Sequence, residues 1–475
     1  MNGTVARMSI AILPGQRFPL GISVLILASV AALLILLPAR DLPFVLAAIG
    51  GCAVVCLMIW KPSAWVVVFV LSLPYWLLTE TDPELRFDEI LVAAFYLLSV
   101  LVWFGKALVA RQRIVHNEID AGILLFFALG TLPNFFIALL NDVEPLRWIR
   151  TWSLLATMLL YFPLRDFLRT SRQRHWFLVG LLILALIAAA KTAYQYWLAT
   201  QNIVYAYEVI ASRVVINAFL FLGASVLTLI AALLLDRWSA KIPLFLAQTI
   251  STIALIVSFF RGFWIAFFFT ALLLFWYLPK QRKWQLIALS SLAAIIAIAI
   301  FALFFKSYMD IALQMLEYRF ASIGSGTQDI SLQARLSETA VVLDLIGQNP
   351  LGGYGLGSTF TYYSPIHRYH QHTPYIHNTY LYLSFTFGIP LALVFVLTLL
   401  TAIRRGIQWS KRPISTETRI YLLGASLLLF GLMITALTFC ILYQRDSLLM
   451  IATALLLLSW GLEQAGYRWT LRKPD

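Results

Sequence analysis

Long apolar runs alternate with short polar connections along almost the whole chain. Each run holds about 20 predominantly apolar residues, the length that an α-helix needs to cross a bilayer. The pattern predicts an all-α fold, a polytopic transmembrane helical bundle with about 12–14 spans. The candidate spans lie near residues 20–38, 42–60, 63–78, 89–109, 121–140, 148–163, 176–197, 214–235, 242–259, 262–278, 285–305, 378–403, 420–440 and 447–463.

One long polar segment, residues 306–377, interrupts this pattern. Irregular backbone is tolerated only where water or protein can satisfy its polar groups, so this segment is expected outside the bilayer. Within it, 308–322 has the apolar spacing of a surface helix, and 331–348 predicts a second helix with Ser331 as N-cap. Asn349-Pro350 ends that helix, the following glycines permit a tight reversal, and Asn378 is placed to cap the next span. We expect one membrane domain, 1–475, with 306–377 inserted as a partly helical loop that forms one wall of an active site.

The composition supports a membrane protein and argues against a soluble one. Apolar residues make up 61% of the chain and charged residues 12%, and the mean hydropathy is +0.85, far from soluble usage. The net charge of +13 is spread over short loops, where Lys and Arg set topology. It therefore predicts no nucleic-acid partner. The distribution favours both termini in the cytoplasm and the 306–377 loop on the outer face of the membrane, in the periplasm or its equivalent.

The N-terminal span and the cysteines carry no separate signal. Residues 19–38 are too long for the apolar region of a signal peptide, so we expect a retained first helix. Cys52, Cys56 and Cys440 all lie in apolar spans, where cysteine is most often a packing residue. We predict no cofactor.

Arginines at the outer ends of spans are the first candidates for chemistry, because a guanidinium at bilayer depth is costly and needs a partner or a function. Arg261 stands where two spans meet with almost no loop, and Arg213 precedes the span that begins at Val214. Arg335 lies on the second loop helix. A guanidinium binds phosphate in bidentate fashion, so Arg261 is a candidate anion clamp, and Arg213 and Arg335 are weaker candidates when each is taken alone. The alternatives are a turn arginine reaching the headgroups for Arg261 and an intrahelical pair with Glu338 for Arg335.

Arg147 and Arg150 are secondary candidates, since Asp142 and Glu144 are near enough in the sequence to neutralise them.

Four of the six histidines fall close together in the loop: His367, His370, His372 and His377. His370 and His372 have a spacing compatible with a metal site, but that run holds no carboxylate. The acidic loop at 80–88 leaves metal-assisted chemistry as a further alternative. His377 directly precedes Asn378 at the mouth of a span, where a neutral imidazole can accept a proton from a hydroxyl. An interfacial cap is its plain structural alternative. The chain has no phosphate-binding loop, dinucleotide fingerprint or zinc-protease motif.

Taken in order, these features resemble the O-antigen ligase and polymerase superfamily of bacterial inner-membrane enzymes. The resemblance covers roughly residues 200–440. It is carried by Arg213, Arg261-Gly262, Arg335, the Pro350-Leu351-Gly352-x-Gly turn and His377-Asn378-x-Tyr380-Leu381. The chain departs from the family in one place: Phe260 stands where members often have Ser, and Ser258 lies two residues earlier.

The resemblance implies an inverting, metal-independent glycosyltransferase that uses a glycan on undecaprenyl diphosphate. Arg213, Arg261 and Arg335 would bind the diphosphate, and His377 would be the general base. Arg147, Arg150, Asn378, His370 and His372 would be secondary site residues. Three acceptors stay open: the lipid A core (a ligase, which we favour), another lipid-linked repeat (a polymerase) or a protein hydroxyl. A transporter or flippase for the same lipid is the rival from another class, although transporters often show internal repeats and none is visible here.

Overall fold

The computed structural model describes residues 42–78, 87–200, 217–304, 317 and 330–467. Backbone contacts divide the chain into two compact units, residues 1–56 and 57–475. The predicted span at 20–38 and most of the predicted surface helix at 308–322 lie outside the described residues.

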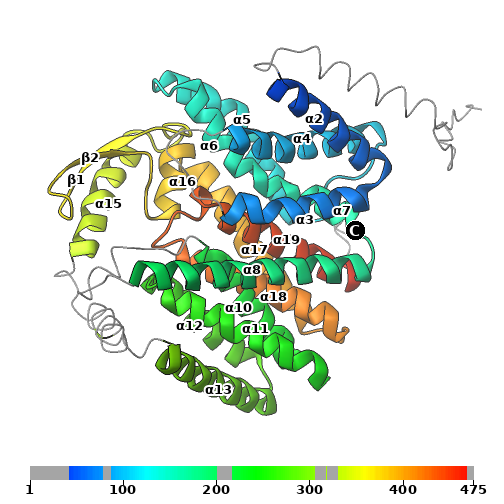
Figure 1. Cartoon of the computed structure of the whole chain (residues 1–475). Coiled ribbons are helices and arrows are strands. Elements are labelled where there is room, and N and C mark those ends of the chain that lie inside the picture. The colour runs from blue at the N-terminus through cyan, green and yellow to red at the C-terminus, as the bar shows by residue number, and fades with distance from the viewer. Residues whose placement is uncertain (1–41, 79–86, 201–216, 305–316, 318–329, 468–475) are drawn as a thin grey trace, which may run out of the picture. The chain divides into compact units, whose positions relative to one another are not determined.

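The described part of the chain is mainly helical (Figure 1). The early helices are α2 (Leu42–Trp60), α3 (Pro62–Leu78), α4 (Phe87–Val109), α5 (Glu118–Leu140), α6 (Pro145–Ala156), η1 (Thr157–Leu160), α7 (Tyr161–Phe167) and α8 (Ser171–Thr200). The later ones are α10 (Ala218–Leu234), α11 (Trp238–Val257), α12 (Arg261–Tyr277), α13 (Lys280–Phe304), α15 (Ile330–Gln348), α16 (Thr379–Phe387), α17 (Ile389–Ser410), α18 (Thr416–Thr435), η4 (Ile441–Tyr443) and α19 (Arg445–Gln464).

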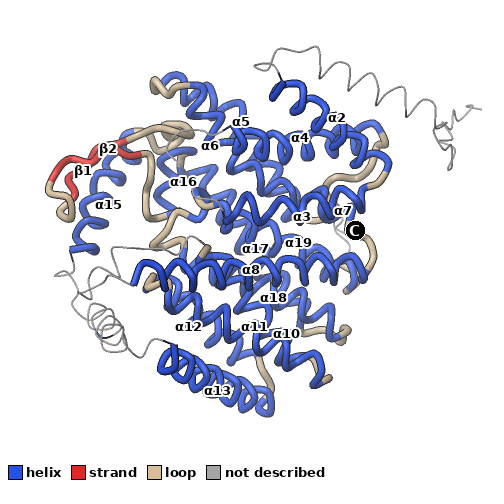
Figure 2. The backbone as a smooth tube through the Cα atoms, in the orientation of Figure 1, coloured by secondary structure: helices blue, strands red, loops and turns tan. Residues whose placement is uncertain are grey.

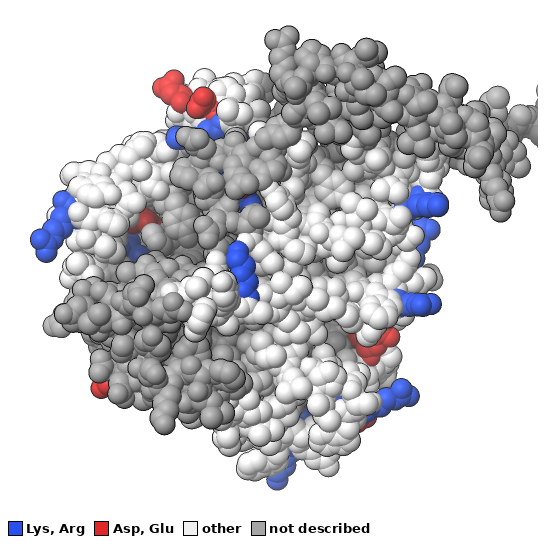
Figure 3. All heavy atoms as spheres, in the orientation of Figure 1, with Lys and Arg blue, Asp and Glu red and all other residues white. Residues whose placement is uncertain are grey.

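The helices confirm an all-α, multi-pass membrane protein. Seven helices in the described ranges are long and apolar enough to cross a membrane, namely α4, α5, α8, α11, α17, α18 and α19. Shorter apolar helices are α3, α10, α12 and the Gly50–Trp60 part of α2. The described residues on the face drawn in Figure 3 are mostly uncharged, and their Lys and Arg side chains are scattered, with several along the right-hand edge.

Two predicted spans are broken rather than continuous. The 148–163 segment runs through α6, η1 and α7. Pro163 has no N–H to donate to the carbonyl of Leu159, so the α-helical ladder is weakened there. The 378–403 segment is divided between α16 and α17 at Gly388, whose φ of +79° ends α16. The backbone turn at Gly388 lets a second segment dock at this point.

The helices α10, α17, α18 and α19 form the centre of the second unit, and α19 is buried along nearly its whole length. At one end, the buried Asp446 carboxylate accepts the N–H groups of Phe219 and Leu220 at 3.0 and 3.3 Å. The side chain of the N-cap residue Asn217 makes no capping bond. Asp446 therefore takes the place of a capping side chain at the start of α10. At the other end, Arg174 of α8 pairs with Glu463 at 3.1 Å.

The loop after α13 contains a β-hairpin that the sequence pattern did not reveal. Strands β1 (Phe360–Ser364) and β2 (Tyr369–Thr373) pair antiparallel, with Phe360 opposite Thr373 and Ser364 opposite Tyr369, as the red segments of Figure 2 show. Burial alternates along β1, so Phe360, Tyr362 and Ser364 face inward. The Ser337 hydroxyl of α15 donates to the Tyr363 carbonyl at 2.9 Å and holds the hairpin against that helix.

Candidate active site

The glycine turn at residues 349–357, which follows α15, is hydrogen-bonded to the break between α16 and α17 at Gly388. Gly353 and Gly355 have φ of +66° and +89°, and an added Cβ at either would meet backbone atoms at 2.6 and 2.5 Å. The turn therefore requires glycine at both positions. Three backbone hydrogen bonds make the attachment: Tyr354 N to Phe385 O at 2.8 Å, Gly355 N to Thr386 O at 3.0 Å and Ile389 N to Pro350 O at 2.8 Å.

The helix α15 presents one carboxylate from an otherwise apolar inner face. Its buried residues recur every fourth position, at Ala334, Glu338, Val342 and Ile346, the spacing of a single helix face. Glu338 is only 2% exposed. A buried carboxylate needs hydrogen-bond donors, and those donors come from the start of α16.

Glu338 meets His377 twice. Its Oε1 accepts the backbone N–H of His377 at 2.7 Å, and its Oε2 lies 2.7 Å from Nδ1 of the imidazole. An ionised carboxylate can only accept, so Nδ1 carries the proton and Nε2 holds the free lone pair. The His377 side chain is 36% exposed. The carboxylate that the sequence suggested as a partner for Arg335 is hydrogen-bonded to His377.

The start of α16 is bound to the linker between α18 and α19, residues 436–444. Asn378 caps α16 as predicted, since its Oδ1 accepts the N–H groups of Tyr380 and Leu381 at 2.9 and 3.2 Å. Its amide also donates to Leu437 O at 3.3 Å. Thr379 donates from N to Ala436 O at 2.8 Å and from its hydroxyl to Phe439 O at 2.6 Å. These bonds fix the backbone that carries His377.

Arg335 and the residues on either side of Arg261 meet at Phe439 in this linker. The Arg335 guanidinium lies 6.0 Å from the centre of the Phe439 ring. Phe260 and Phe263, which flank Arg261, pack on the same ring at 5.1 and 5.2 Å. Arg335 and the first turn of α12 are therefore neighbours across one aromatic ring.

Arg261 begins α12 after a very tight reversal, as the sequence predicts. The helix α11 ends at Val257, Phe259 has a φ of +53°, and α12 starts at Arg261. The Ser258 hydroxyl donates to Leu255 O at 2.6 Å and accepts Phe260 N–H at 3.3 Å. The displaced serine thus stabilises the turn, and its hydroxyl is occupied there.

A cluster of aromatic side chains, Tyr375 and Tyr443, extends from His377 towards α6. Tyr375 packs edge-on against the His377 imidazole at 5.0 Å and against Tyr443 at 5.6 Å. Burial raises the pKa of Tyr375 well above its usual range, so the phenol stays neutral. Burial also raises the pKa of Tyr443, and the positive charges of Arg150 and Arg147 oppose that rise. The two secondary arginines therefore act electrostatically on the same aromatic group.

The buried Cys440 thiol beside Tyr375 also stays neutral. Burial raises the pKa of Cys440 far above its ordinary value, and its N–H donates to the Tyr375 hydroxyl oxygen at 3.4 Å. The Arg147 side chain lies against Gly357 (φ +86°), where an added Cβ would meet Arg147 Cγ at 3.0 Å.

The remaining candidate residues, Arg213, His370 and His372, are not among the side chains described around His377. Arg213 lies outside the described residues. His370 and His372 belong to β2, where His370 packs on Tyr363 at 5.6 Å and Nδ1 of His372 lies 3.0 Å from the Thr361 hydroxyl. Across the described residues, no group of three His, Cys, Asp or Glu side chains is arranged to hold a metal ion.

Sequence reasoning missed Glu338 as the partner of His377, and it missed Tyr443. Glu338 was visible only as a lone acid on a helix face, because nothing in the sequence reports a contact across 39 residues. Its place in an apolar row at every fourth position was the one available signal.

A comparison with protein families identifies the central part of this arrangement. Residues 246–396 match the family model described as O-antigen ligase. The match supports a resemblance of this segment to the O-antigen ligase and polymerase superfamily. The matched segment contains Arg261, Arg335, Glu338 and His377. Among curated proteins, the search found no match to the chain.

Similarity to the O-antigen ligase family implies a glycosyltransferase-type enzyme. It also implies a lipid-linked glycan donor and a glycan or lipid acceptor at a membrane, in agreement with the apolar helices. The linker at 436–444, with Phe439 and Tyr443, and the α6 arginines lie outside the matched segment.

Proposed function

We propose that the protein is an O-antigen ligase, which transfers a glycan from undecaprenyl diphosphate to a hydroxyl of the lipid A core on the periplasmic face of the inner membrane. The observation that carries this proposal is the pair formed by Glu338 and His377 inside the O-antigen ligase segment. A histidine oriented by a buried carboxylate, with its second nitrogen free, is the arrangement expected of a general base.

His377 takes the proton of the acceptor hydroxyl at Nε2. The Glu338 carboxylate holds the tautomer that leaves Nε2 unprotonated, and it stabilises the imidazolium that forms. As it loses its proton, the acceptor oxygen attacks the anomeric carbon. The bond from that carbon to the diphosphate oxygen breaks, and the diphosphate leaves with the electron pair. Attack opposite the leaving group inverts the anomeric carbon. The proton then passes from the imidazolium to water.

Arg261, Arg335 and Arg213 bind the diphosphate and neutralise the charge that develops as it departs. Support for two of them comes from the shared Phe439 ring, which brings Arg335 close to the first turn of α12. Guanidinium groups provide this charge without a metal ion, so the proposed reaction is metal-independent.

Arg147 and Arg150 extend the positive charge beyond Tyr443 and serve as secondary anion contacts. Asn378 acts through the backbone, because its side chain is occupied as the cap of α16. His370 and His372 lie on the exposed face of the hairpin, where they are available to a long glycan.

Deletion in the native host, followed by analysis of the lipopolysaccharide, tests the proposed acceptor. A ligase predicts free lipid-linked polymer together with a lipid A core that carries no repeats. A core that carries a single repeat would identify a polymerase instead, and an unchanged lipopolysaccharide would contradict both. Reconstituted protein must also join donor glycan to acceptor without ATP or an ion gradient, which separates transfer from lipid transport.

A further inference from the structure

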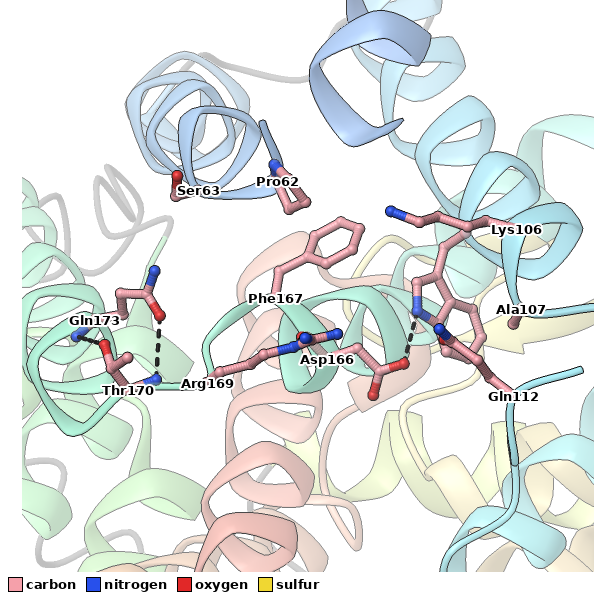
Figure 4. Close-up of a pocket in the computed structure, with 11 residues that line it drawn as sticks. Pro62, Ser63, Lys106, Ala107, Gln112, Asp166, Phe167, Arg169, Thr170 and Gln173 are labelled. Atoms are coloured by element: carbon pink, nitrogen blue, oxygen red, sulfur yellow. Dashed lines mark hydrogen bonds between the residues drawn. The ribbon is translucent and has the colours of Figure 1, made fainter. Parts of the chain in front are cut away.

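A polar pocket lies away from the His377 site. Its volume is about 380 Å³, within the range of small-ligand sites. Four segments line it: the start of α3, the end of α4 with the residues after it, the end of α7 and the start of α8. In Figure 4 the Phe167 ring stands near the middle, with Pro62 and Ser63 on one side and Arg169 on the other.

The pocket is at the opposite end of the helices from His377. On the His377 side, Arg445 follows Tyr443 by two residues and pairs with Glu89 near the start of α4. The pocket residue Lys106 lies 17 residues after Glu89 in the same helix, about 26 Å along its axis.

The helix α19 runs between the same two ends. It begins at Arg445, and Glu463 near its other end binds Arg174, which is next to the pocket residue Gln173 in the sequence. By the distribution of Lys and Arg, this is the end assigned to the cytoplasm.

Two cations face the pocket and are held by neutral groups. Lys106 Nζ lies 3.4 and 3.5 Å from the carbonyls of Met58 and Ile59 and 5.9 Å from the centre of the Phe167 ring. The Nε of Arg169 donates to the Asp166 carbonyl at 2.9 Å. Within the described residues, neither cation has a carboxylate at ion-pair distance.

The acid in the lining already has hydrogen-bond donors. Asp166 accepts from Arg165 Nε at 3.1 Å and from Trp103 Nε1 at 3.0 Å, and Arg165 also pairs with the buried Asp120 at 2.8 Å. The lining therefore sets two cations, Lys106 and Arg169, against one carboxylate whose charge Arg165 offsets in part. Gln112, Gln173 and Ser63 add neutral hydrogen-bonding groups to the same lining.

We propose that this pocket binds the phosphate of an anionic ligand, and that its occupant in the membrane is the headgroup of an anionic phospholipid. Basic pockets between membrane helices at the cytoplasmic surface suit such headgroups, because the leaflet there is rich in anionic lipid. Lys106 supplies a point charge and Arg169 supplies a fork of donors for the phosphate oxygens. A bound lipid joins α3, α4, α7 and α8 at this end, so it stabilises the folded protein.

The experiment measures the thermal unfolding midpoint of purified full-length protein in detergent, with added phosphatidylglycerol, phosphatidylcholine or inorganic phosphate. The test variant is Lys106→Gln/Arg169→Gln. The matched control is Arg111→Gln/Arg172→Gln, which removes the same charge from exposed residues at the same end that do not line the pocket.

We expect phosphatidylglycerol to raise the midpoint of the wild type and of the control, and phosphatidylcholine to have little effect. The pocket variant should lose most of the response. A response to inorganic phosphate that is also lost in the pocket variant supports the phosphate site and identifies a free anion as a second source. An equal phosphatidylglycerol response in the pocket and control variants, or no response in the wild type, overturns the proposal. Native mass spectrometry that counts bound lipids gives an independent reading if the variant is less stable.

Discussion

The Glu338 carboxylate holds both the backbone and the side chain of His377, each at 2.7 Å, from a helix that lies 39 residues earlier in the chain. Because Glu338 is almost fully buried while the His377 imidazole is partly exposed, the pair has a protected side and an accessible side. The Glu338 carboxylate fixes the tautomer, which leaves the lone pair of the partly exposed imidazole on Nε2. The arrangement makes the role of each residue separately testable.

Replacing Glu338 with Gln should lower kcat by about 10²–10⁴-fold while the KM for the donor changes little. The amide has nearly the same shape, but its NH₂ group next to Nδ1 favours the tautomer with the proton on Nε2, which cannot accept one. Initial rates of glycan transfer in detergent measure the effect. Asp344→Asn is the matched control, because it changes an exposed acid of the same helix.

His377→Ala should lose transfer activity by a similar factor at an unchanged protein level, and free imidazole should restore part of it. Imidazole should not restore Glu338→Gln, whose own histidine still fills the site. If both variants transfer glycan at rates near those of the wild type, His377 is an interfacial cap residue and the proposed base lies elsewhere.

Arg261→Lys should retain less than a tenth of the wild-type kcat/KM. Lysine keeps the charge but loses the planar fork that binds two phosphate oxygens. The loss should be smaller for Arg368→Lys, a conservative change in the exposed turn of the hairpin. Wild-type transfer by Arg261→Lys in the same assay would mean that Arg261 is a turn residue facing the headgroups.

The sequence predicted much of the helical framework and the place where it is interrupted, because bilayer-length apolar runs and glycine turns are local signals. The loop helix was predicted at 331–348 and is observed as Ile330–Gln348. Ser331 lies inside that helix, so its assignment as the N-cap was wrong. The cap at Asn378 was correct, because a capping bond depends only on the next three residues.

The parts that the sequence could not predict depend on contacts between distant segments. Gly388 divides a continuous apolar run because the 349–357 turn docks there, and the run itself shows no break. The hairpin is short and rich in Tyr and His, so its alternation was hidden. The partner of His377 was missed for the same reason, since Glu338 reaches it only after α15 folds against α16.

Chelation should leave the reaction unaffected. The proposed site neutralises the leaving diphosphate with guanidinium groups, so dialysis against EDTA should keep at least about 80% of the transfer rate, because positioned charges need no exchangeable ion. A control with added Mg²⁺ or Mn²⁺ should give the same rate. Inhibition by EDTA that a divalent cation reverses would favour the alternatives based on the 80–88 loop or the histidine run.

Gly388→Ala should destabilise the protein and reduce transfer together. At a φ of +79° an L-residue is strained, and the added Cβ would collide with the Leu351 carbonyl. The strain alone costs about 1–2 kcal/mol, and the collision displaces the turn that holds α15 and Glu338 in place. We expect a lower thermal midpoint and a lower kcat. Gly347→Ala, in the last turn of α15, is the matched control, because its Cβ meets nothing within 4 Å. Normal stability and activity in Gly388→Ala would show that docking of the glycine turn does not position the Glu338–His377 pair.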